Sequence, residues 1–297
     1  MNLENKYPGK DISVDDIINK FPLAAKKHEN HKTKFNIAGV EFGGETIPIF
    51  AGPNMVESQE LILDVAKNVK ERGAHFLRGG AFKPLTFPYR SAKYNETREQ
   101  GLQWLADAKR EIGIPIITEV MEERYIDAVA EVSDILQIGT RNMQNFPFLT
   151  ACAKTGKPIM LKRHYGASLR DWLGAAEYIL IEGNEKLILC ERGVSVPHTH
   201  RATSRFLMDL QVIPAAQEIS HLPIVVDPSH ATFWRPWVAP MALAGIASGA
   251  DGVMLEVHPD PQNAAVDPLQ PIDYEEFGDL MNRMDSVAKA SYKRKVL

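Results

Sequence analysis

Eight short apolar runs, separated by stretches with helical spacing, dominate the hydrophobic pattern of the chain. Each run is continuous rather than alternating and rich in β-branched residues, as is typical of parallel strands buried on both faces. The runs read IFAGPN, HFLRGG, PIITEV, ILQIGTR, PIMLKR, LILCERG, PIVVDPSH and GVMLEVH. Stretches between them, such as QELILDVAKNVKER and RDWLGAAEYILI, repeat apolar residues at helical spacing. The pattern predicts an α/β fold, a (β/α)8 barrel with its active site at the carboxyl ends of the strands.

The residues before the first run predict two additions to this barrel. Residues 1–33 are polar and rich in Lys, Asn and His, and we expect them to form an arm packed outside the barrel. The next residues, KFNIAGVEFGGETIPIF, alternate around glycines, which predicts a hairpin that closes the bottom of the barrel. The chain therefore divides into the arm, 1–33, and a catalytic barrel, 34–297.

Composition and charge narrow the class of protein. The chain has 297 residues, 44% of them hydrophobic, which is enough for one large core. A net charge of −4 offers no general basic surface to nucleic acid. No run approaches membrane-spanning length, and the first residues lack the apolar core of a signal peptide. The only cysteines, Cys152 and Cys190, fall in a helical stretch and a buried run, so we expect a cytoplasmic protein without disulfides.

Cationic side chains stand at the ends of several predicted strands: Arg78, Lys83, Arg141, Lys162, Arg163 and Arg192. A barrel brings the carboxyl ends of its strands together, so we expect these charges to share one mouth. Like charges held together are costly without anions, and Arg clamps phosphate and carboxylate groups bidentately. The set predicts a small polyanionic substrate. For any single member, a solvated charge paired with a neighbouring loop is the alternative.

Ligand-type and acid–base residues end other runs. His230 ends DPSH, Glu256 lies in LEVHP, and Asp267 follows in the next loop. An imidazole with two carboxylates suits a half-open site for Mn, Fe or Zn, or these groups bond the substrate and one another without a metal. Residue types alone leave both readings open. Glu119 could hold a water and move a proton beside Lys83, or merely balance its charge.

The ordered blocks around these residues resemble a known enzyme family. RGGAFKPLT, ITEV, LQIGTRN, MLKR, CERG, IVVDPSH and EVHPDPQNAAVDPLQ look like the signature blocks of the type I 3-deoxy-arabino-heptulosonate 7-phosphate (DAHP) synthases, closest to their short branch. They are also similar to the related 3-deoxy-manno-octulosonate 8-phosphate synthases. The resemblance implies a transferase that condenses phosphoenolpyruvate with a phosphorylated aldose, most directly erythrose 4-phosphate in the shikimate pathway of aromatic amino acid biosynthesis.

The resemblance also implies a role for each matched residue. Arg78 and Lys83 would bind the carboxylate of phosphoenolpyruvate, with Lys83 near the proton transfers, and Glu119 would position the attacking water. His230 would join Lys83 and Glu119 as a catalytic residue. The phosphate and the remaining substrate contacts would fall to Arg141, Lys162, Arg163, Arg192, Thr86 and Asp267.

The metal site of the family is matched only in part. His230, Glu256 and Asp267 match three ligands, but Asn54 in GPNMVES stands where the family has a cysteine. Among the octulosonate synthases, the same exchange of Cys for Asn separates metal-using from metal-free members. Because Asn is a poor ligand for a transition metal, we expect no required cofactor, with a divalent Mn, Fe or Zn as the alternative.

Further departures concern the aldose acceptor. The motif KPRT reads KPLT, so Leu85 replaces an arginine that meets the acceptor phosphate, at a cost of about 1.5–3 kcal/mol unless Arg90 substitutes. The loop 194–206 and the segment after DPSH are rewritten, which places at the rim His198, His200, Arg201, Trp234 and Trp237. The two histidines could contact a different acceptor or be solvated loop residues, and we favour the latter. Two alternatives therefore stand beside DAHP synthesis. One is the same chemistry on another aldose in a specialised pathway, and the other is a non-catalytic barrel that binds phosphosugars.

The resemblance leads us to expect small-molecule substrates as partners, with no nucleic acid and no membrane. Homo-oligomers are common among such relatives, so we expect one here. The arm is too short for the regulatory domain that many relatives carry, so we expect no feedback by aromatic amino acids through a separate domain.

Overall fold

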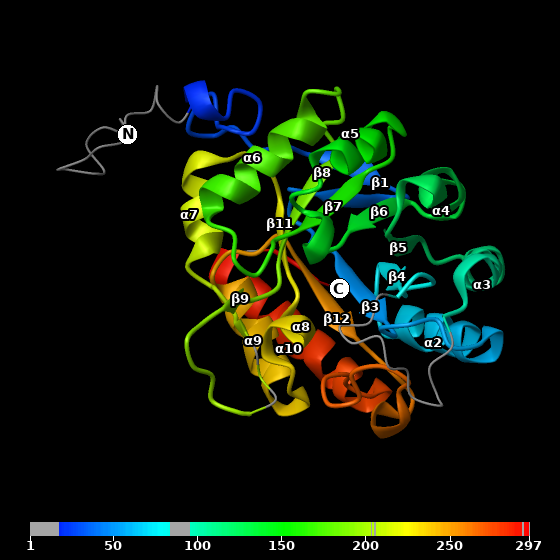
Figure 1. The fold of residues 1–297 in the computed structure, drawn as a ribbon. Helices are drawn as coiled ribbons and strands as arrows, with labels where there is room; N and C mark the ends of the chain where they lie inside the picture. Colours follow the sequence, from blue (N-terminus) through cyan, green and yellow to red (C-terminus); the bar gives the residue numbers. More distant parts are fainter. Residues whose placement is uncertain (1–17, 84–95, 203, 205, 293, 297) are drawn as a thin grey trace.

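A closed barrel of eight parallel strands forms the centre of the computed structural model, which describes residues 18–83, 96–202, 204, 206–292 and 294–296. The strands follow the order β11-β12-β3-β4-β5-β6-β7-β8, and helices surround them (Figure 1). The predicted (β/α)8 barrel is confirmed, because each of the eight apolar runs forms one strand. The strands are β3 Ile49–Gly52, β4 Phe76–Arg78, β5 Ile116–Val120, β6 Ile135–Ile138, β7 Ile159–Lys162, β8 Leu187–Glu191, β11 Ile224–Val226 and β12 Gly252–Glu256.

Helices with one apolar face cover the outside of the barrel. α6 begins with a capping box, in which Ser168 and Asp171 satisfy each other's backbone N–H groups, as its sequence favours. Among the described residues, no helix combines the length and apolar composition needed to cross a membrane. The helices are α2 Gln59–Glu71, α3 Arg98–Ile112, α4 Ile126–Val132, α5 Phe146–Lys154, α6 Leu169–Leu180, α7 Val212–Ile219, α8 Pro228–Thr232, α9 Arg235–Ala247 and α10 Tyr274–Tyr292, with short 3-10 turns η2 Glu123–Tyr125, η3 Thr140–Asn142 and η4 Pro261–Asn263.

A hairpin closes the amino-terminal end of the barrel. Its strands, β1 Phe35–Ile37 and β2 Val40–Phe42, are joined by Ala38 and Gly39, both with positive φ, as a two-residue turn of this kind requires. The hairpin contributes Ile37 and Phe42 to the apolar cluster inside the barrel, which also contains Phe50, Phe76, Ile117, Ile135, Met160, Ile188, Cys190, Val225 and Met254. The interior is therefore packed solid at this end, and the open end is the carboxyl one.

Residues 18–33 lie outside the barrel, against its helices. Ala25 bridges to Ser220 after α7, and the backbone of Ala24 donates to Glu177 of α6 at 2.7 Å. Phe21 is buried in the core between the barrel and its helices. The first part of the predicted arm, 1–17, lies outside the described residues. A second small hairpin, β9 Val194–Ser195 with β10 Phe206–Leu207, stands at the carboxyl end of the barrel.

We expect Phe42→Ala to lower the free energy of unfolding by about 3–5 kcal/mol, because it empties a fully buried site inside the barrel. The ring of Phe42 packs within 6.1 Å of the ring of Phe50 and 5.7 Å of that of Phe76. Chemical denaturation measures the change. Ile181→Ala, at a side chain that is 72% exposed, is the control and should change stability by less than about 0.5 kcal/mol. Equal effects of the two substitutions would contradict a packed plug.

Candidate active site

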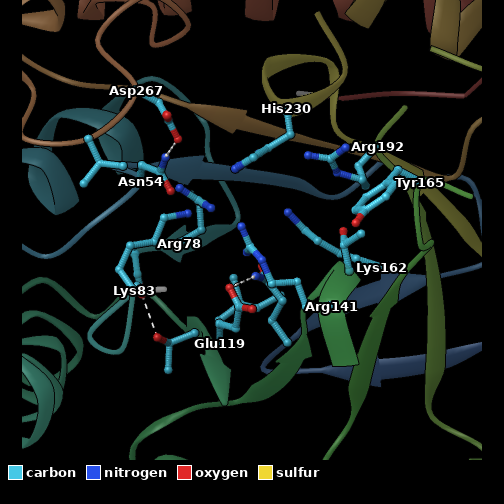
Figure 2. A pocket seen from close by; sticks show the side chains of 18 of the residues that line it. Asn54, Arg78, Lys83, Glu119, Arg141, Lys162, Tyr165, Arg192, His230 and Asp267 are labelled. Atoms are coloured by element: carbon cyan, nitrogen blue, oxygen red, sulfur yellow. Dashed lines mark hydrogen bonds between the residues drawn. The ribbon is translucent and has the colours of Figure 1, made fainter. Parts of the chain in front are cut away.

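A cavity of about 350 Å³ opens at the carboxyl ends of the barrel strands. Its cationic lining comes from five separate places in the chain: the end of β4, the loop after it, η3, the end of β7 and the residue after β8. Figure 2 shows these side chains turned toward a common space. They are Arg78, Lys83, Arg141, Lys162 and Arg192. The structure thus brings together at one mouth most of the cations that the sequence analysis singled out.

Buried acids alternate with buried bases across the floor of this cavity. Lys162 Nζ lies 2.5 Å from Asp227 Oδ2, which lies 2.8 Å from His230 Nδ1. His230 Nε2 lies 3.0 Å from Glu256 Oε1, which lies 3.8 Å from Arg78 Nη1. The backbone also supports this chain, since Asp227 caps α8 and Arg78 donates to a carbonyl of the first barrel loop. Opposite ends of the cationic lining are therefore held by one continuous polar chain, which we call the floor chain.

The carboxylates of the floor chain are strongly biased toward their ionised form. Burial opposes ionisation of Asp227, but His230 and Lys162 outweigh burial and hold the pKa of this carboxyl well below its usual range. Burial likewise opposes ionisation of Glu256, yet His230 and Arg78 lower its pKa. Two fixed negative charges thus lie beneath the positive rim and offset part of its repulsion.

Lys83 and Glu119 lie on the same side of the cavity, near β5. Burial lowers the pKa of Lys83, although the charges of Glu119 and Asp267 favour its ammonium form. Glu119 accepts a hydrogen bond from Gln137 Nε2 at 3.3 Å. A methyl group on Gly139 would meet Glu119 Oε1 at 1.8 Å, so a glycine is needed there to leave room for the carboxylate. The pair joins an acid with a depressed pKa to a carboxylate in a confined position, as proton transfer requires.

The possible metal ligands form two separate pairs. Asn54 Nδ2 donates to Asp267 Oδ2 at 2.9 Å, while His230 bonds Glu256 as described. Across the described residues, no three His, Cys, Asp or Glu side chains are grouped closely enough to hold a metal ion. Asn54 offers Asp267 a donor rather than a thiolate, and an amide is a weak ligand for a transition metal. The donor set present therefore does not fit a tight transition-metal site.

Arg163 and Thr86 stand apart from the other sequence-predicted substrate contacts. Arg163 does not line the cavity, because it follows Lys162 directly and its side chain takes the opposite side of the strand end. Its guanidinium instead binds Glu191 Oε2 at 3.0 Å and Asp209 Oδ2 at 2.8 Å. Thr86 lies outside the described residues, as do Leu85 and Arg90.

The sequence analysis did not anticipate an aromatic wall, formed by Tyr165, Phe206 and Phe233 on the side of the cavity next to Arg192. The rings of Tyr165 and Phe206 are 5.6 Å apart, and those of Phe206 and Phe233 are 5.9 Å apart. The Arg192 guanidinium lies 4.2 Å from the centre of the Phe206 ring. Tyr165 follows MLKR by two residues, so its place after a strand end was a usable signal. Phe206 gave no such signal, since it is distant in sequence from any barrel strand end and pairs with Ser195 across a loop.

The two histidines of the rewritten rim match the reading that they are solvated loop residues. His198 and His200 are exposed, and neither they nor the tryptophans line the cavity. Arg201 stacks on Trp234, with its guanidinium 3.5 Å from the ring centre. The contact between Arg201 and Trp234 ties the loop that carries Arg201 to the segment after α8. The aromatic residues that line the cavity are Tyr165, Phe206 and Phe233.

The chain is similar in sequence to a known protein family and to proteins that are named as sugar-phosphate aldolases. The model of the DAHP synthetase I family matches residues 23–290. A phospho-2-dehydro-3-deoxyheptonate aldolase of Thermotoga maritima is 38% identical over 278 residues, which are 94% of this chain and 80% of the relative. A 2-dehydro-3-deoxyphosphooctonate aldolase of Methylococcus capsulatus is 30% identical over 89% of this chain and 98% of the relative.

Solved structures agree with the sequence relatives. The crystal structure of the Thermotoga maritima DAHP synthase superposes with a TM-score of 0.86 at 38% identity, covering 93% of this chain and 78% of that one. A truncated form of the 3-deoxy-D-arabino-heptulosonate 7-phosphate synthase from the same organism superposes with a TM-score of 0.85 at 37% identity. The match covers 94% of this chain and 100% of that one. Fold and sequence thus point to the same relatives.

Asp227→Asn should lower the free energy of unfolding by about 3–5 kcal/mol near neutral pH, since it leaves Lys162 buried without its carboxylate. The folded-state pKa of Asp227 is depressed, so its stabilisation is complete above the unfolded carboxyl pKa, about 4, and is lost as the pH falls below it. Denaturation at a series of pH values should therefore show the gap between wild type and variant narrowing in acid.

Asp279→Asn is the matched control, because this carboxylate is 66% exposed and pairs with Arg283 at the surface. It should change stability by less than about 1 kcal/mol at any pH. A gap for Asp227→Asn that stays constant down to about pH 2 would contradict the depressed pKa.

Proposed function

Because the chain belongs to the DAHP synthetase I family, we propose that it condenses phosphoenolpyruvate with erythrose 4-phosphate, giving 3-deoxy-arabino-heptulosonate 7-phosphate and inorganic phosphate. The class of activity, a transferase that joins phosphoenolpyruvate to a phosphorylated sugar through a new C–C bond, follows from the family. The observation that supports the site assignment is the convergence of the cationic lining on one cavity in a chain of net charge −4. A ligand with a carboxylate and a phosphate offsets that repulsion.

The two ends of the cavity suit the two anionic groups of phosphoenolpyruvate. We assign its carboxylate to Arg78 and Lys83, next to β4, and its phosphate to Arg141, Lys162 and Arg192, across the cavity. Each charge-assisted hydrogen bond contributes about 1.5–3 kcal/mol. Since these cations are held in place before the substrate arrives, they also need no rearrangement when charge develops in the transition state.

Lys83 and Glu119 supply the proton transfers in this proposal. C3 of phosphoenolpyruvate bonds to the aldehyde carbon while Lys83, whose pKa is lowered by burial, gives a proton to the aldehyde oxygen. Glu119 holds a water that adds its oxygen to C2 and takes the proton that this water releases. The C2–O bond to phosphate then breaks as the C2 hydroxyl becomes the ketone, the hydroxyl proton goes to the departing phosphate oxygen, and inorganic phosphate leaves toward Lys162 and Arg192.

The aromatic wall favours a second candidate, the same chemistry on another aldose. Tyr165, Phe206 and Phe233 give one side of the cavity large, weakly hydrated surfaces. Leu85 removes one charged contact to the acceptor phosphate that the family motif supplies. A longer or less polar acceptor than erythrose 4-phosphate would cover more of this wall, and an octulosonate product requires one that is a carbon longer.

Phosphate release from phosphoenolpyruvate in the presence of different aldose phosphates tests these alternatives. We expect turnover with erythrose 4-phosphate to exceed that with arabinose 5-phosphate. The reverse order would replace the heptulosonate assignment by the octulosonate-type one. Lys83→Ala should reduce turnover by at least about a hundredfold, because it removes a proton donor. Lys289→Ala, at an exposed lysine of α10, is the control and should leave turnover unchanged. Absence of turnover with every aldose would favour a binding protein.

We also propose that turnover does not need a bound metal ion, since Asn54 engages Asp267 instead of offering a thiolate. Exhaustive chelation should leave phosphate release unchanged. Asn54→Cys should bind Zn more tightly than wild type, because thiolate is a strong ligand for this metal, and direct metal analysis after dialysis measures it. Inactivation of the wild type by chelation, with recovery on adding Mn or Zn, would contradict the proposal.

A further inference from the structure

A buried ion pair lies directly behind the strand ends that carry the cations of the phosphate side. Lys162 and Arg163 are consecutive at the end of β7, and Glu191 and Arg192 are consecutive at the end of β8. Successive side chains point to opposite faces of a sheet, so one member of each couple lines the cavity and the other faces the surrounding helices. We call Arg163 and Glu191 the outer pair, and Lys162 and Arg192 the inner pair. Each residue of the outer pair is thus joined by a peptide bond to one residue of the inner pair.

The guanidinium of Arg163 donates hydrogen bonds from Nε and Nη1 that hold the neighbouring loops in place. Nη1 binds Glu191 Oε2 at 3.0 Å and Asp209 Oδ2 at 2.8 Å, and Nε donates to the backbone carbonyl of Ala167 at 3.0 Å. The guanidinium lies 5.8 Å from the centre of the Trp172 ring on α6. Arg163 therefore connects the loop after β7, the end of β8 and the residues that lead into α7.

Glu191 holds the backbone on the far side of Arg192. Its Oε1 accepts from the N–H of Gly193 at 2.7 Å and from that of Asp209 at 3.3 Å. Gly193 has φ +95, and a side chain there would meet Ala231 of α8 at 3.0 Å, so the turn is tightly packed as well. The residues immediately before and after Arg192 are consequently fixed by one carboxylate.

Net stabilisation of the fold is a weak reason for this arrangement. Arg163 is 5% exposed and Glu191 is 0% exposed, so both charges are removed from water. The desolvation cost of a buried pair often equals its attraction, and replacement of both partners by apolar residues is frequently neutral or stabilising. What an apolar pair does not reproduce is the direction of the hydrogen bonds that fix the loop backbone.

We infer that Arg163 and Glu191, with Asp209, are positioning residues that aim Lys162 and Arg192 at the phosphate of phosphoenolpyruvate. This inference rests on the proposed function, which assigns the phosphate to the inner pair. A misplacement of a binding group by about 1 Å can cost as much as a hundredfold in rate, so a small shift of either strand end is enough to matter. Arg163 acts on the substrate without touching it.

Calorimetric titration of phosphoenolpyruvate into wild type and the double variant Arg163→Met/Glu191→Met tests the inference, with the unfolding temperature measured in parallel. We expect the double variant to unfold near the wild-type temperature but to bind phosphoenolpyruvate about ten- to a hundredfold more weakly. Its KM for phosphoenolpyruvate should rise while its KM for the aldose does not. Tight binding by the double variant would overturn the inference.

A conservative variant keeps the test decisive if the double variant does not fold. Arg163→Lys retains a charge for Glu191 but does not supply both the Nε and the Nη1 bonds. It should raise KM for phosphoenolpyruvate with little change in unfolding temperature, and an unchanged KM would equally overturn the positioning role.

Arg294→Met is the matched control, because this buried arginine pairs with Asp251 at 3.1 Å, ahead of β12 at the opposite end of the barrel. It should lower stability and leave phosphoenolpyruvate binding unchanged. Wild type that does not bind phosphoenolpyruvate would refute the proposed function itself. Wild type that binds, together with variants that bind equally well, would refute only the positioning role.

Discussion

Repulsion among the cations around one small cavity is the constraint on which the rest of the site depends. Two unit charges about 4 Å apart repel by about 4 kcal/mol at an effective dielectric constant of about 20, so several together need opposite charge nearby. The floor chain supplies part of it from below, through Asp227 and Glu256. In the proposed function the substrate supplies the remainder, because a site balanced only after binding favours a dianionic or trianionic ligand over a neutral one.

Charge balance and geometry are achieved by separate groups in this protein. Asp227 and Glu256 lie under the cavity and touch its lining directly, at Lys162 and Arg78. The Arg163–Glu191 pair lies on the helix-facing side of the strand ends and binds the Asp209 carboxylate and the backbone of Ala167, Gly193 and Asp209. At the end of β7, Asp227 therefore balances the charge of Lys162 on the inside, while the Arg163–Glu191 pair holds the strand end on the outside.

The barrel was predictable from the sequence because burial on both faces forces continuous apolar runs, and each of the eight runs became a strand. The position of the cavity mouth was also predictable, because the carboxyl ends of all the parallel strands meet at one end of the barrel. Which of two adjacent charges faces inward was not. Lys162 and Arg163 carry the same sign, and only the parity of the strand end, fixed by hydrogen bonding to β8, separates them. Phe206 was likewise hidden, because its place depends on a short pairing with Ser195 across a loop.

The exchange at Asn54 is best understood through the same balance of charge. In the floor chain, Glu256 Oε1 lies 3.0 Å from His230 Nε2 and accepts a hydrogen bond from Gln270 at 2.7 Å. Asp267 accepts a neutral amide from Asn54, which satisfies its oxygen without adding charge to a crowded positive site. In the proposed reaction Lys83 polarises the aldehyde, and the charges of Glu119 and Asp267 both favour its ammonium form. If turnover needs no metal, as we propose, the electrophilic role at the aldehyde passes from the position of Asn54 in the floor to Lys83 in the wall of the cavity.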